Sequence, residues 1–585
     1  MINIKEDARL SVLNHSSAHV MAQAIKRRYP QAKFWVGPVI EDGFYYDVDL
    51  GDDVITEADL PLIEREMKKI SKEAKYIVRE ELTKDEALEV FADDPYKIDL
   101  IQNNLSDDDV TISAYRQGEF VDLCRGPHVE RTKEVKFYKL LKVSGAYWKA
   151  DANNKMLQRI YGIAFDTQED LDAYLNWLEE AKKRDHKILG RELGLFMFSE
   201  YGPGFPFWLA DGVTLKDSLI DYWKQVHIRR GYDFIETPAM MSRELWEKSG
   251  HWDNYQDNMY ISEIDERKFA VKPMNCPGSI LIYKHGLYSY RDLPLRMAEL
   301  GHVHRHEASG ALNGLFRVRA FTQDDAHIYV TQEQIEAEVL EIIDFIDEVY
   351  SVFGLTYSIE LSTRPEDKYI GDISVWDASE TALKNACEKA GKAYKINEGD
   401  GAFYGPKLDF IVKDSLNREW QCGTVQLDMN LPDRFELNYI NDHGEKVQPV
   451  MLHRVIFGSV ERFIGILIEH FAGAFPVWLA PLQVRIIPVN AEYHTEYAEQ
   501  VKVLLENNGI RVDVDARNEK LGYRLREAQK SKIPLQLILG DKEVESQSVN
   551  LRRYGEQSQH TVSIQAFVEL ALEEIENKTI RNLKK

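Results

Sequence analysis

The chain has 585 residues, a formal net charge of −24 and a hydrophobic fraction of 44%. A single domain rarely exceeds about 250 residues, so three or four domains are expected, and the composition excludes a disordered protein. No window approaches the roughly 18–20 apolar residues of a membrane span, and the N-terminus has no signal core, which predicts a protein without a membrane partner. Four widely separated cysteines exclude a disulfide framework and favour a cytoplasmic location.

Changes in residue pattern along the chain predict four regions. Short strand-like runs and helical stretches alternate up to about residue 166. An amphipathic linker helix is predicted over 167–187, followed by a glycine- and proline-rich loop at 201–206. A large α/β region then extends over 188–476. The tail, 477–585, alternates strands with helices, which indicates a small α/β domain.

Two groups of potential metal ligands occur in the first region. His15 and His19 are one helical turn apart and therefore share a helix face. Cys124 and His128 flank a Gly-Pro turn. Together the four side chains have the chemistry of a metal site, although either pair alone is more typical of a solvated surface.

Three segments of the central region together suggest a nucleotide site. The first, 230–238, combines a helix end, a glycine, a short strand and a proline. The second spans 304–325 and is predicted to form two strands joined by a loop. Side chains along a strand alternate between its two faces. Arg305 and Glu307 are therefore predicted to share one face of the first strand. One face of the second strand is predicted to carry Arg317, Phe321, Gln323 and Asp325. Arginines clamp phosphates and stack on flat rings, while the alternative is a surface hairpin with solvated charges.

The third segment, 457–469, places Arg462 in an otherwise apolar strand-to-helix stretch, where a charge is costly unless it is paired or faces a ligand. In this order the three segments resemble the signature motifs of class II aminoacyl-tRNA synthetases. The resemblance implies that the first motif forms a homodimer interface and that the other two bind ATP with Mg²⁺. It assigns the α-phosphate to Arg305, the γ-phosphate to Arg462, and other ATP contacts to Glu307, Arg317, Phe321, Gln421 and Thr424.

A narrower resemblance rests on Cys276, His327 and His453, which spacing alone would not connect. Threonine–tRNA ligases place one cysteine and two histidines in these contexts to hold a zinc ion, which keeps positions open for substrate. Coordination of the amino group and β-hydroxyl would reject valine, which lacks the hydroxyl. The resemblance also implies threonine contacts and catalytic roles for further residues: Met274, Gln323, Asp325, Tyr404 and Gln426 for binding, and Lys407 and His251 for catalysis.

Serine also carries a β-hydroxyl, and one methyl group supplies only about 1–3 kcal/mol of discrimination, so a second, hydrolytic site is expected. The N-terminal region is similar to the editing domain that threonine– and alanine–tRNA ligases share. The implied editing residues are His15, His19, Tyr46, Asp122, Cys124 and His128. The sequence leaves open whether they act through a metal ion or through imidazoles and ordered water.

The C-terminal region contains a locally basic stretch, with seven basic and four acidic residues over 511–532. This stretch is compatible with a phosphate-facing patch or with a solvated helix face. The region looks like the family's anticodon-binding domain, and the implied reading side chains are Asn518, Arg526, Glu543 and Arg552.

The resemblance covers the whole chain and implies a class II antiparallel-sheet core between an α+β editing domain and an α/β anticodon-binding domain. The implied activity is ATP-dependent ligation of L-threonine to tRNA(Thr) through threonyl-adenylate, with hydrolysis of seryl-tRNA(Thr). Most bacterial members begin with a further small β-rich domain, which we expect to be missing because His15 already belongs to the editing region. The alternative is an RNA-binding or regulatory relative without charging activity.

Overall fold

The computed structural model describes residues 3–103, 112–151, 153–367 and 369–581. The chain divides into two compact units, Met1–Glu180 and Ala181–Lys585. No helix in the described ranges has both the length and the apolar character needed to cross a membrane.

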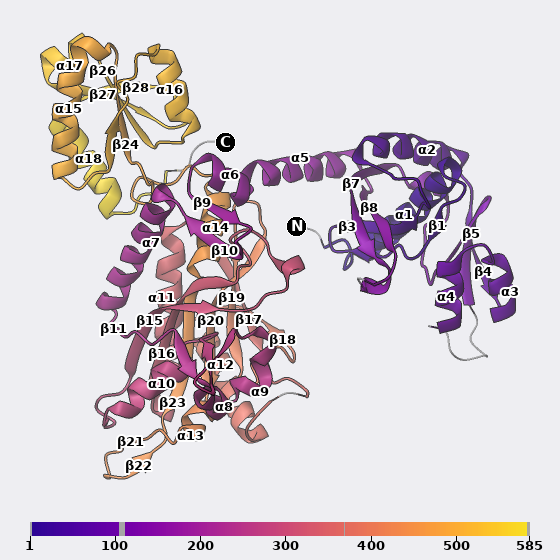
Figure 1. Ribbon diagram of the computed structural model, residues 1–585, viewed down its shortest axis with the longest axis horizontal. Coiled ribbons are helices and arrows are strands. Elements are labelled where there is room, and N and C mark those ends of the chain that lie inside the picture. The colour runs from indigo at the N-terminus through magenta and orange to yellow at the C-terminus, as the bar shows by residue number, and fades with distance from the viewer. Residues whose placement is uncertain (1–2, 104–111, 152, 368, 582–585) are drawn as a thin grey trace. The chain divides into compact units, whose positions relative to one another are not determined.

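The first unit contains two sheets with their own helices (Figure 1). The larger sheet is entirely antiparallel, and helices α1 and α2 pack against it and against each other. Its elements are α1 (Ala8–Arg28), β1 (Lys33–Phe34), β2 (Val39–Ile40), β3 (Gly43–Asp49), α2 (Leu60–Glu73), β7 (Phe137–Tyr147) and β8 (Met156–Phe165). The smaller part consists of β4 (Ile77–Leu82), α3 (Lys84–Val90), α4 (Pro95–Asn103), β5 (Ile112–Gln117) and β6 (Phe120–Leu123).

The predicted single linker helix is two helices. Asp185 ends α5 (Gln168–Arg184), and its carboxylate accepts a hydrogen bond from the Lys187 N–H at 2.8 Å, capping α6 (His186–Glu192). The glycine- and proline-rich stretch predicted as a loop is also different. Its residues 202–206 lie in β10 (Gly202–Trp208), which pairs with β9 (Phe196–Ser199) in an irregular two-stranded hairpin. Proline is tolerated there because neither strand has a second neighbour within the described part of the chain.

The second unit is built on an eight-stranded sheet in the order β11-β15-β16-β23-β20-β19-β17-β18. Only the outermost pair at each edge is parallel, which confirms the predicted antiparallel class II core. In chain order the strands are β11 (Asp233–Phe234), β15 (Leu295–His304), β16 (Ala320–Val330), β17 (Thr356–Ser362), β18 (Tyr394–Asn397), β19 (Lys407–Lys413), β20 (Glu419–Asp428) and β23 (Val450–Ser459).

Apolar side chains of this sheet form one continuous core with the helices α7 (Ala210–Arg229), α11 (Ile335–Val352), α12 (Ile373–Lys389) and α14 (Val460–His470). The second unit also contains smaller elements: β12 (Met240–Ser242), α8 (Arg243–Ser249), α9 (His251–Tyr255), β13 (Ile261–Ile264), β14 (Arg267–Val271), α10 (Cys276–His285), α13 (Asn430–Arg434), β21 (Tyr439–Ile440) and β22 (Lys446–Val447).

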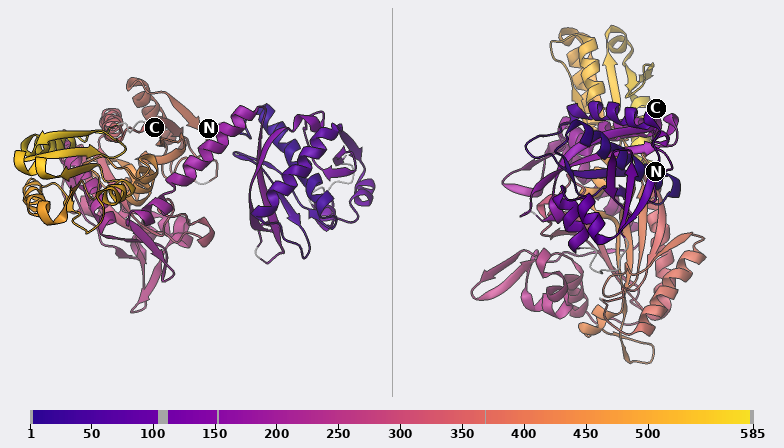
Figure 2. Two further views of the ribbon diagram at one scale, coloured as in Figure 1. Left: turned by 90° about the horizontal axis from the view of Figure 1, so that it is seen from above. Right: turned by 90° about the vertical axis from the view of Figure 1, so that its right-hand side faces the viewer.

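Residues 484–576 contain a five-stranded sheet in the order β25-β24-β26-β27-β28, with helices packed around it (Figure 2). Two neighbouring pairs are parallel and two antiparallel, so the predicted α/β class is confirmed. The elements are β24 (Val484–Pro488), α15 (Ala491–Asn507), β25 (Val512–Val514), α16 (Leu521–Lys530), β26 (Leu535–Leu539), α17 (Asp541–Ser546), β27 (Ser548–Arg553), β28 (Gln559–Ser563) and α18 (Ile564–Glu576).

Candidate functional site

A cavity of about 220 Å³ opens where the ends of β16, β20 and β23 meet. Its lining includes every residue predicted to bind ATP: Arg305, Glu307, Arg317, Phe321, Gln421, Thr424 and Arg462. The guanidinium group of Arg305 lies 5.1 Å from the centre of the Phe321 ring and donates to the Pro273 carbonyl at 3.1 Å. Three arginines on one small cavity form a site for a polyanion with a flat ring.

The predicted strand register in this region is partly wrong. Strand β15 ends at His304 and β16 begins at Ala320, so Arg305, Glu307 and Arg317 lie in the connecting loop. Glu307 and Arg317 meet through an ion pair, with Arg317 Nε 2.9 Å from Glu307 Oε2, and not through strand alternation. The alternation argument applies only to the residues within β16.

Arg462 occupies the first turn of α14, where the hydroxyl of Ser459 caps the helix by accepting the Arg462 N–H at 3.1 Å. Its Nε donates to the Phe316 carbonyl at 3.0 Å. Burial lowers the pKa of Arg462, and the nearby positive charges of Arg317 and Arg305 lower it further. An anionic ligand would relieve that repulsion.

The predicted zinc ligands lie together beside this cavity. Cys276 begins α10, and His327 on β16 is the direct register partner of His453 on β23. One ligand atom from each of the three lies within 4.8 Å of the other two, and all three side chains are buried. Among the described residues, His327 Nδ1 has no hydrogen-bond partner, and burial raises the pKa of the Cys276 thiol while lowering that of His327. An unpartnered buried nitrogen beside a thiol and an imidazole fits a zinc ion.

A carboxylate that the sequence reasoning missed, Asp428, holds His453 in place. Asp428 Oδ2 lies 2.9 Å from His453 Nε2, while its Oδ1 accepts the N–H groups of Asn430 and Leu431. Asn275 donates to Asp325 at 3.2 Å, and burial raises the pKa of Asp325 to about 7. No sequence signal marked Asp428, because its partner is 25 residues away on another strand.

The other predicted threonine-site residues fall into different environments. Tyr404 donates to Gln426 at 2.5 Å, and its ring centre lies 5.1 Å from that of His453. Met274 packs against the neighbouring apolar cluster, whereas Gln323 lines the nucleotide cavity.

The predicted catalytic residues Lys407 and His251 each have defined partners. Lys407 Nζ donates to Asp409 at 2.5 Å, and Asp409 also accepts from Gln421 and Thr424. His251 is fully buried at the start of α9, with Nε2 3.9 Å from Cys276 Sγ. Burial, and then the nearby His453 and Arg305, lower its pKa to about 3, so the ring is neutral near pH 7.

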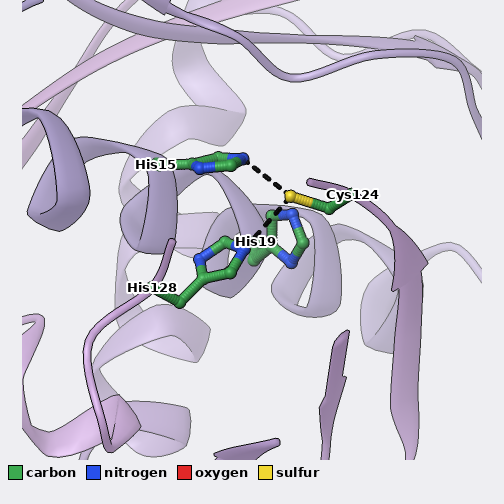
Figure 3. A group of neighbouring side chains, drawn as sticks. All are labelled: His15, His19, Cys124 and His128. Atoms are coloured by element: carbon green, nitrogen blue, oxygen red, sulfur yellow. Dashed lines mark hydrogen bonds between the residues drawn. The ribbon is translucent and has the colours of Figure 1, made fainter. Parts of the chain in front are cut away.

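A second cluster of ligand-type side chains lies in the first unit (Figure 3). The thiol of Cys124, just after β6, is 3.0 Å from His15 Nε2 and 3.3 Å from His128 Nε2, and His19 stands beside them. The turn between Cys124 and His128 depends on Gly126, which has φ +69°. A Cβ at this position would lie 2.1 Å from the Tyr115 hydroxyl.

The cluster opens to a cavity of about 780 Å³ whose lining includes five of the six predicted editing residues, His15, His19, Tyr46, Asp122 and Cys124. Burial raises the pKa of Cys124 to about 12 and lowers the pKa values of His15, His19 and His128, so all four are neutral near pH 7. Neutral imidazoles suit proton transfer to and from water, as well as metal binding.

The sequence reasoning also missed Lys97. Its Nζ lies 2.5 Å from Asp122 Oδ1 and donates to the Tyr46 hydroxyl at 3.1 Å and to the Trp35 carbonyl at 2.9 Å. Tyr46 in turn donates to Asp122. A buried cation thus fixes the carboxylate that borders the cavity.

The basic stretch in the C-terminal region is less available than the sequence indicated. Arg511, Arg524 and Lys532 donate to backbone carbonyls within the protein. Asn518 and Arg526 are exposed, whereas Glu543 is buried and accepts the Gly540 N–H at 3.0 Å as a helix cap. Arg552 is half-buried and donates to the Glu556 carbonyl at 3.1 Å.

Three family models match the chain. Residues 260–471 match the tRNA synthetase class II core domain (G, H, P, S and T), residues 483–574 match an anticodon binding domain, and residues 112–161 match the threonyl and alanyl tRNA synthetase second additional domain.

Similar whole proteins and solved structures point the same way. Threonine–tRNA ligase 2 of Bacillus subtilis is 54% identical over 99% of this chain and 90% of its own, and threonine–tRNA ligase of Acetivibrio thermocellus is 53% identical over 99% and 91%. A crystal structure described as the RNA binding domain of threonyl-tRNA synthetase from Cryptosporidium parvum is 40% identical, with a TM-score of 0.65, over 66% of this chain and 98% of its own. With such identity over nearly its full length, the chain belongs to the threonine–tRNA ligase family of class II synthetases.

Proposed function

We propose that this protein activates L-threonine with ATP, transfers it to tRNA(Thr) and hydrolyses seryl-tRNA(Thr) at a separate site. The observation that carries the first step is the convergence of Cys276, His327 and His453 beside a cavity lined by three arginines. The whole-chain identity to threonine–tRNA ligases supports the same activity.

For adenylate formation, the chain's own part is to bind and orient the nucleotide. Arg305 is assigned to the α-phosphate at which the threonine carboxylate attacks, and Arg462 to the γ-phosphate, with Mg²⁺ accompanying ATP. Phe321 offers its ring to adenine, and the Glu307–Arg317 pair closes the same side of the cavity. Fixed positive charge in a buried site stabilises charge that develops on the phosphoryl oxygens.

For amino-acid selection, a zinc ion held by Cys276, His327 and His453 would offer open positions to the amino and β-hydroxyl groups of threonine. Asp325 and the Tyr404–Gln426 pair are assigned to the rest of the amino acid, together with Met274 and Gln323. Lys407 and His251 are assigned to catalysis, with His251 assisting transfer to the RNA. Valine lacks the hydroxyl and is excluded, whereas serine keeps it and requires correction.

That correction is assigned to the first unit. His15, His19, Cys124 and His128 border or adjoin a cavity of about 780 Å³, and Tyr46 and Asp122 form part of the same hydrogen-bonded group. Neutral imidazoles there activate water for attack on the ester carbonyl.

Two further assignments complete the proposal. The enzyme acts as a homodimer, which is supported by exposed apolar side chains on and near the first motif: Ile228, Phe234 and Met240 are 64%, 43% and 42% exposed. The C-terminal domain binds the anticodon, with Asn518 and Arg526 as the exposed candidates and Glu543 and Arg552 beside them.

The test is threonine-dependent exchange of pyrophosphate into ATP, followed by charging of tRNA(Thr), with valine and serine as competitors. We expect exchange with threonine, weaker exchange with serine and almost none with valine, and net charging with threonine only. Equal activation of valine, or exchange without charging, would contradict the proposal. The latter result would indicate a relative that binds RNA without charging it.

A further inference from the structure

The first turn of α6 contacts the loop that carries the nucleotide-binding residues. His186 is only 1% exposed, and its Nε2 accepts a hydrogen bond from the Leu315 N–H at 3.0 Å. Its Nδ1 lies 2.6 Å from Glu469 Oε1, to which it donates. One imidazole therefore joins a backbone amide in the loop between β15 and β16 to a carboxylate on α14.

The loop is shaped to reach this imidazole. Residues 313–317 form a tight turn in which the Phe316 N–H donates to the Asn313 carbonyl at 2.9 Å. Gly314 has φ +49°, and a Cβ there would lie 2.1 Å from His186 Nε2, so only glycine permits the approach. Lys187, the next residue of α6, donates to the Asn313 side chain at 3.2 Å.

The turn leads directly to the nucleotide cavity. Phe316 packs on the His186 ring with centres 4.0 Å apart, and its carbonyl accepts from Arg462 Nε at 3.0 Å. Arg317 follows at once and lines the cavity. Glu469 lies two turns after Arg462 on α14, so His186 contacts the supports of both arginines.

Asp185, His186 and Glu469 have metal-ligand chemistry and lie within 4.8 Å of one another. Both ring nitrogens of His186 already have partners, however, and Arg418 Nη1 lies 2.5 Å from the other Glu469 oxygen. The cluster is therefore a hydrogen-bonded anchor.

We propose that His186 is a positioning residue for ATP. Through the Leu315 amide it holds the turn that presents Arg317 and supports Arg462, and it touches no substrate itself. The inference rests on the proposed ATP site. The proposal predicts that losing the hydrogen bond to the Leu315 amide raises KM for ATP and leaves KM for threonine unchanged.

Two conservative substitutions separate the two contacts of the ring. In His186→Asn, the side-chain amide can replace Nδ1 and keep the bond to Glu469, but it cannot reach the Leu315 amide. In His186→Gln, the side-chain oxygen can replace Nε2 and accept from Leu315. We expect the Asn variant to raise KM for ATP roughly tenfold in pyrophosphate exchange, and the Gln variant to stay within about twofold of the unaltered enzyme, because only the Asn variant loses the hydrogen bond to the buried Leu315 amide.

The matched control is His470→Ala. His470 follows Glu469 on α14 and accepts the Ser415 N–H at 3.1 Å, on a segment separate from the turn. This variant is expected to lose stability but to keep its KM for ATP. In all variants KM for threonine and kcat should change less than KM for ATP.

A second readout does not depend on activity. Hydrogen–deuterium exchange of the full chain without substrates should show faster exchange of the peptide containing Leu315 in the Asn variant than in the Gln variant. Equal exchange and equal KM values for ATP in the two variants would overturn the proposal. If the unaltered protein shows no threonine-dependent exchange, the proposed function fails, and the deuterium result still decides whether His186 holds the turn.

Discussion

The ammonium group of Lys97 lies 2.5 Å from the carboxylate of Asp122, and the two side chains are only 3% and 2% exposed. Removing one member of a buried pair leaves an uncompensated charge, which typically costs about 3–5 kcal/mol. Because Asp122 also accepts from Tyr46 and lies 3.4 Å from His19 Nε2, this pair connects the stability of the first unit to the geometry of its histidine cluster.

Replacing Lys97 with methionine should therefore abolish hydrolysis of seryl-tRNA(Thr) while leaving threonine-dependent pyrophosphate exchange within about twofold, since the two sites lie in different compact units. Deacylation of preformed seryl-tRNA(Thr) measures the first effect. The double substitution Lys97→Met with Asp122→Asn should recover thermal stability but not hydrolysis.

Lys26→Met is the matched control for this loss. Lys26 is a half-buried lysine of the first unit, and its ammonium group donates to the Ala32 carbonyl at 2.8 Å and not to a carboxylate of the cluster. That variant should hydrolyse seryl-tRNA(Thr) at the normal rate. A Lys97→Met enzyme that edits as fast as the control would show that the pair is only structural.

A second prediction concerns the tautomer of His453. Its Nε2 donates to Asp428, which leaves Nδ1 with a lone pair for a metal ion. In Asp428→Asn, the side-chain oxygen can still accept the hydrogen bonds from the Asn430 and Leu431 N–H groups. The new side-chain NH₂ group then faces Nε2 of His453. Nε2 must accept this N–H, so the ring proton moves to Nδ1. We expect zinc affinity to fall by about 10–100-fold, measured by chelator competition.

Chelator treatment of the unaltered enzyme should likewise remove threonine-dependent exchange, and added zinc should restore it. Asp428→Glu, which keeps the charge, is the companion variant. If the protein as purified carries less than stoichiometric zinc and still activates threonine, the assignment of Cys276, His327 and His453 is wrong.

These residues also show where sequence reasoning reaches its limit. The spacing of His15 and His19 was sufficient to place both on one helix face, because a helix turn is a local property. His327 and His453 were connected only by family resemblance, since their direct pairing depends on two strands far apart in sequence. Arg511 and Arg524 count toward the basic stretch over 511–532, but composition does not reveal that they donate to backbone carbonyls within the protein.

A third prediction concerns Asp324, which joins β16 to β23. Its two oxygens accept the N–H groups of Ile456, Phe457 and Gly458 at 3.0, 3.0 and 2.8 Å. Asparagine has one acceptor oxygen, so Asp324→Asn leaves at least one buried N–H without a partner, at a cost of about 1–3 kcal/mol. We expect a lower Tm and, because Gly458 lines the nucleotide cavity, a higher KM for ATP.

Asp47→Asn provides the comparison for Asp324. Asp47 is a fully buried carboxylate of the first unit that pairs with Arg159 at 2.7 Å. This variant should lower the stability of the first unit and leave KM for ATP unchanged. An Asp324→Asn enzyme with normal KM for ATP would show that the β16–β23 connection stabilises the fold without shaping the nucleotide site.

The last prediction concerns pH and His227, whose Nδ1 donates to the Trp223 carbonyl and whose Nε2 accepts from Arg454. Burial, and then the charge of Arg454, lower the pKa of His227 to about 2 in the folded protein. Below pH 6.5 the imidazole is therefore protonated in the unfolded chain but stays neutral in the folded one. Stability from the neutral ring is fully present above pH 6.5 and falls on acidification by up to about 1.4 kcal/mol per pH unit.

His227→Gln keeps an acceptor for Arg454 but cannot titrate. Urea unfolding followed by tryptophan fluorescence between about pH 5 and 7 should therefore show a shallower pH dependence in the variant, whereas parallel curves would contradict a neutral His227.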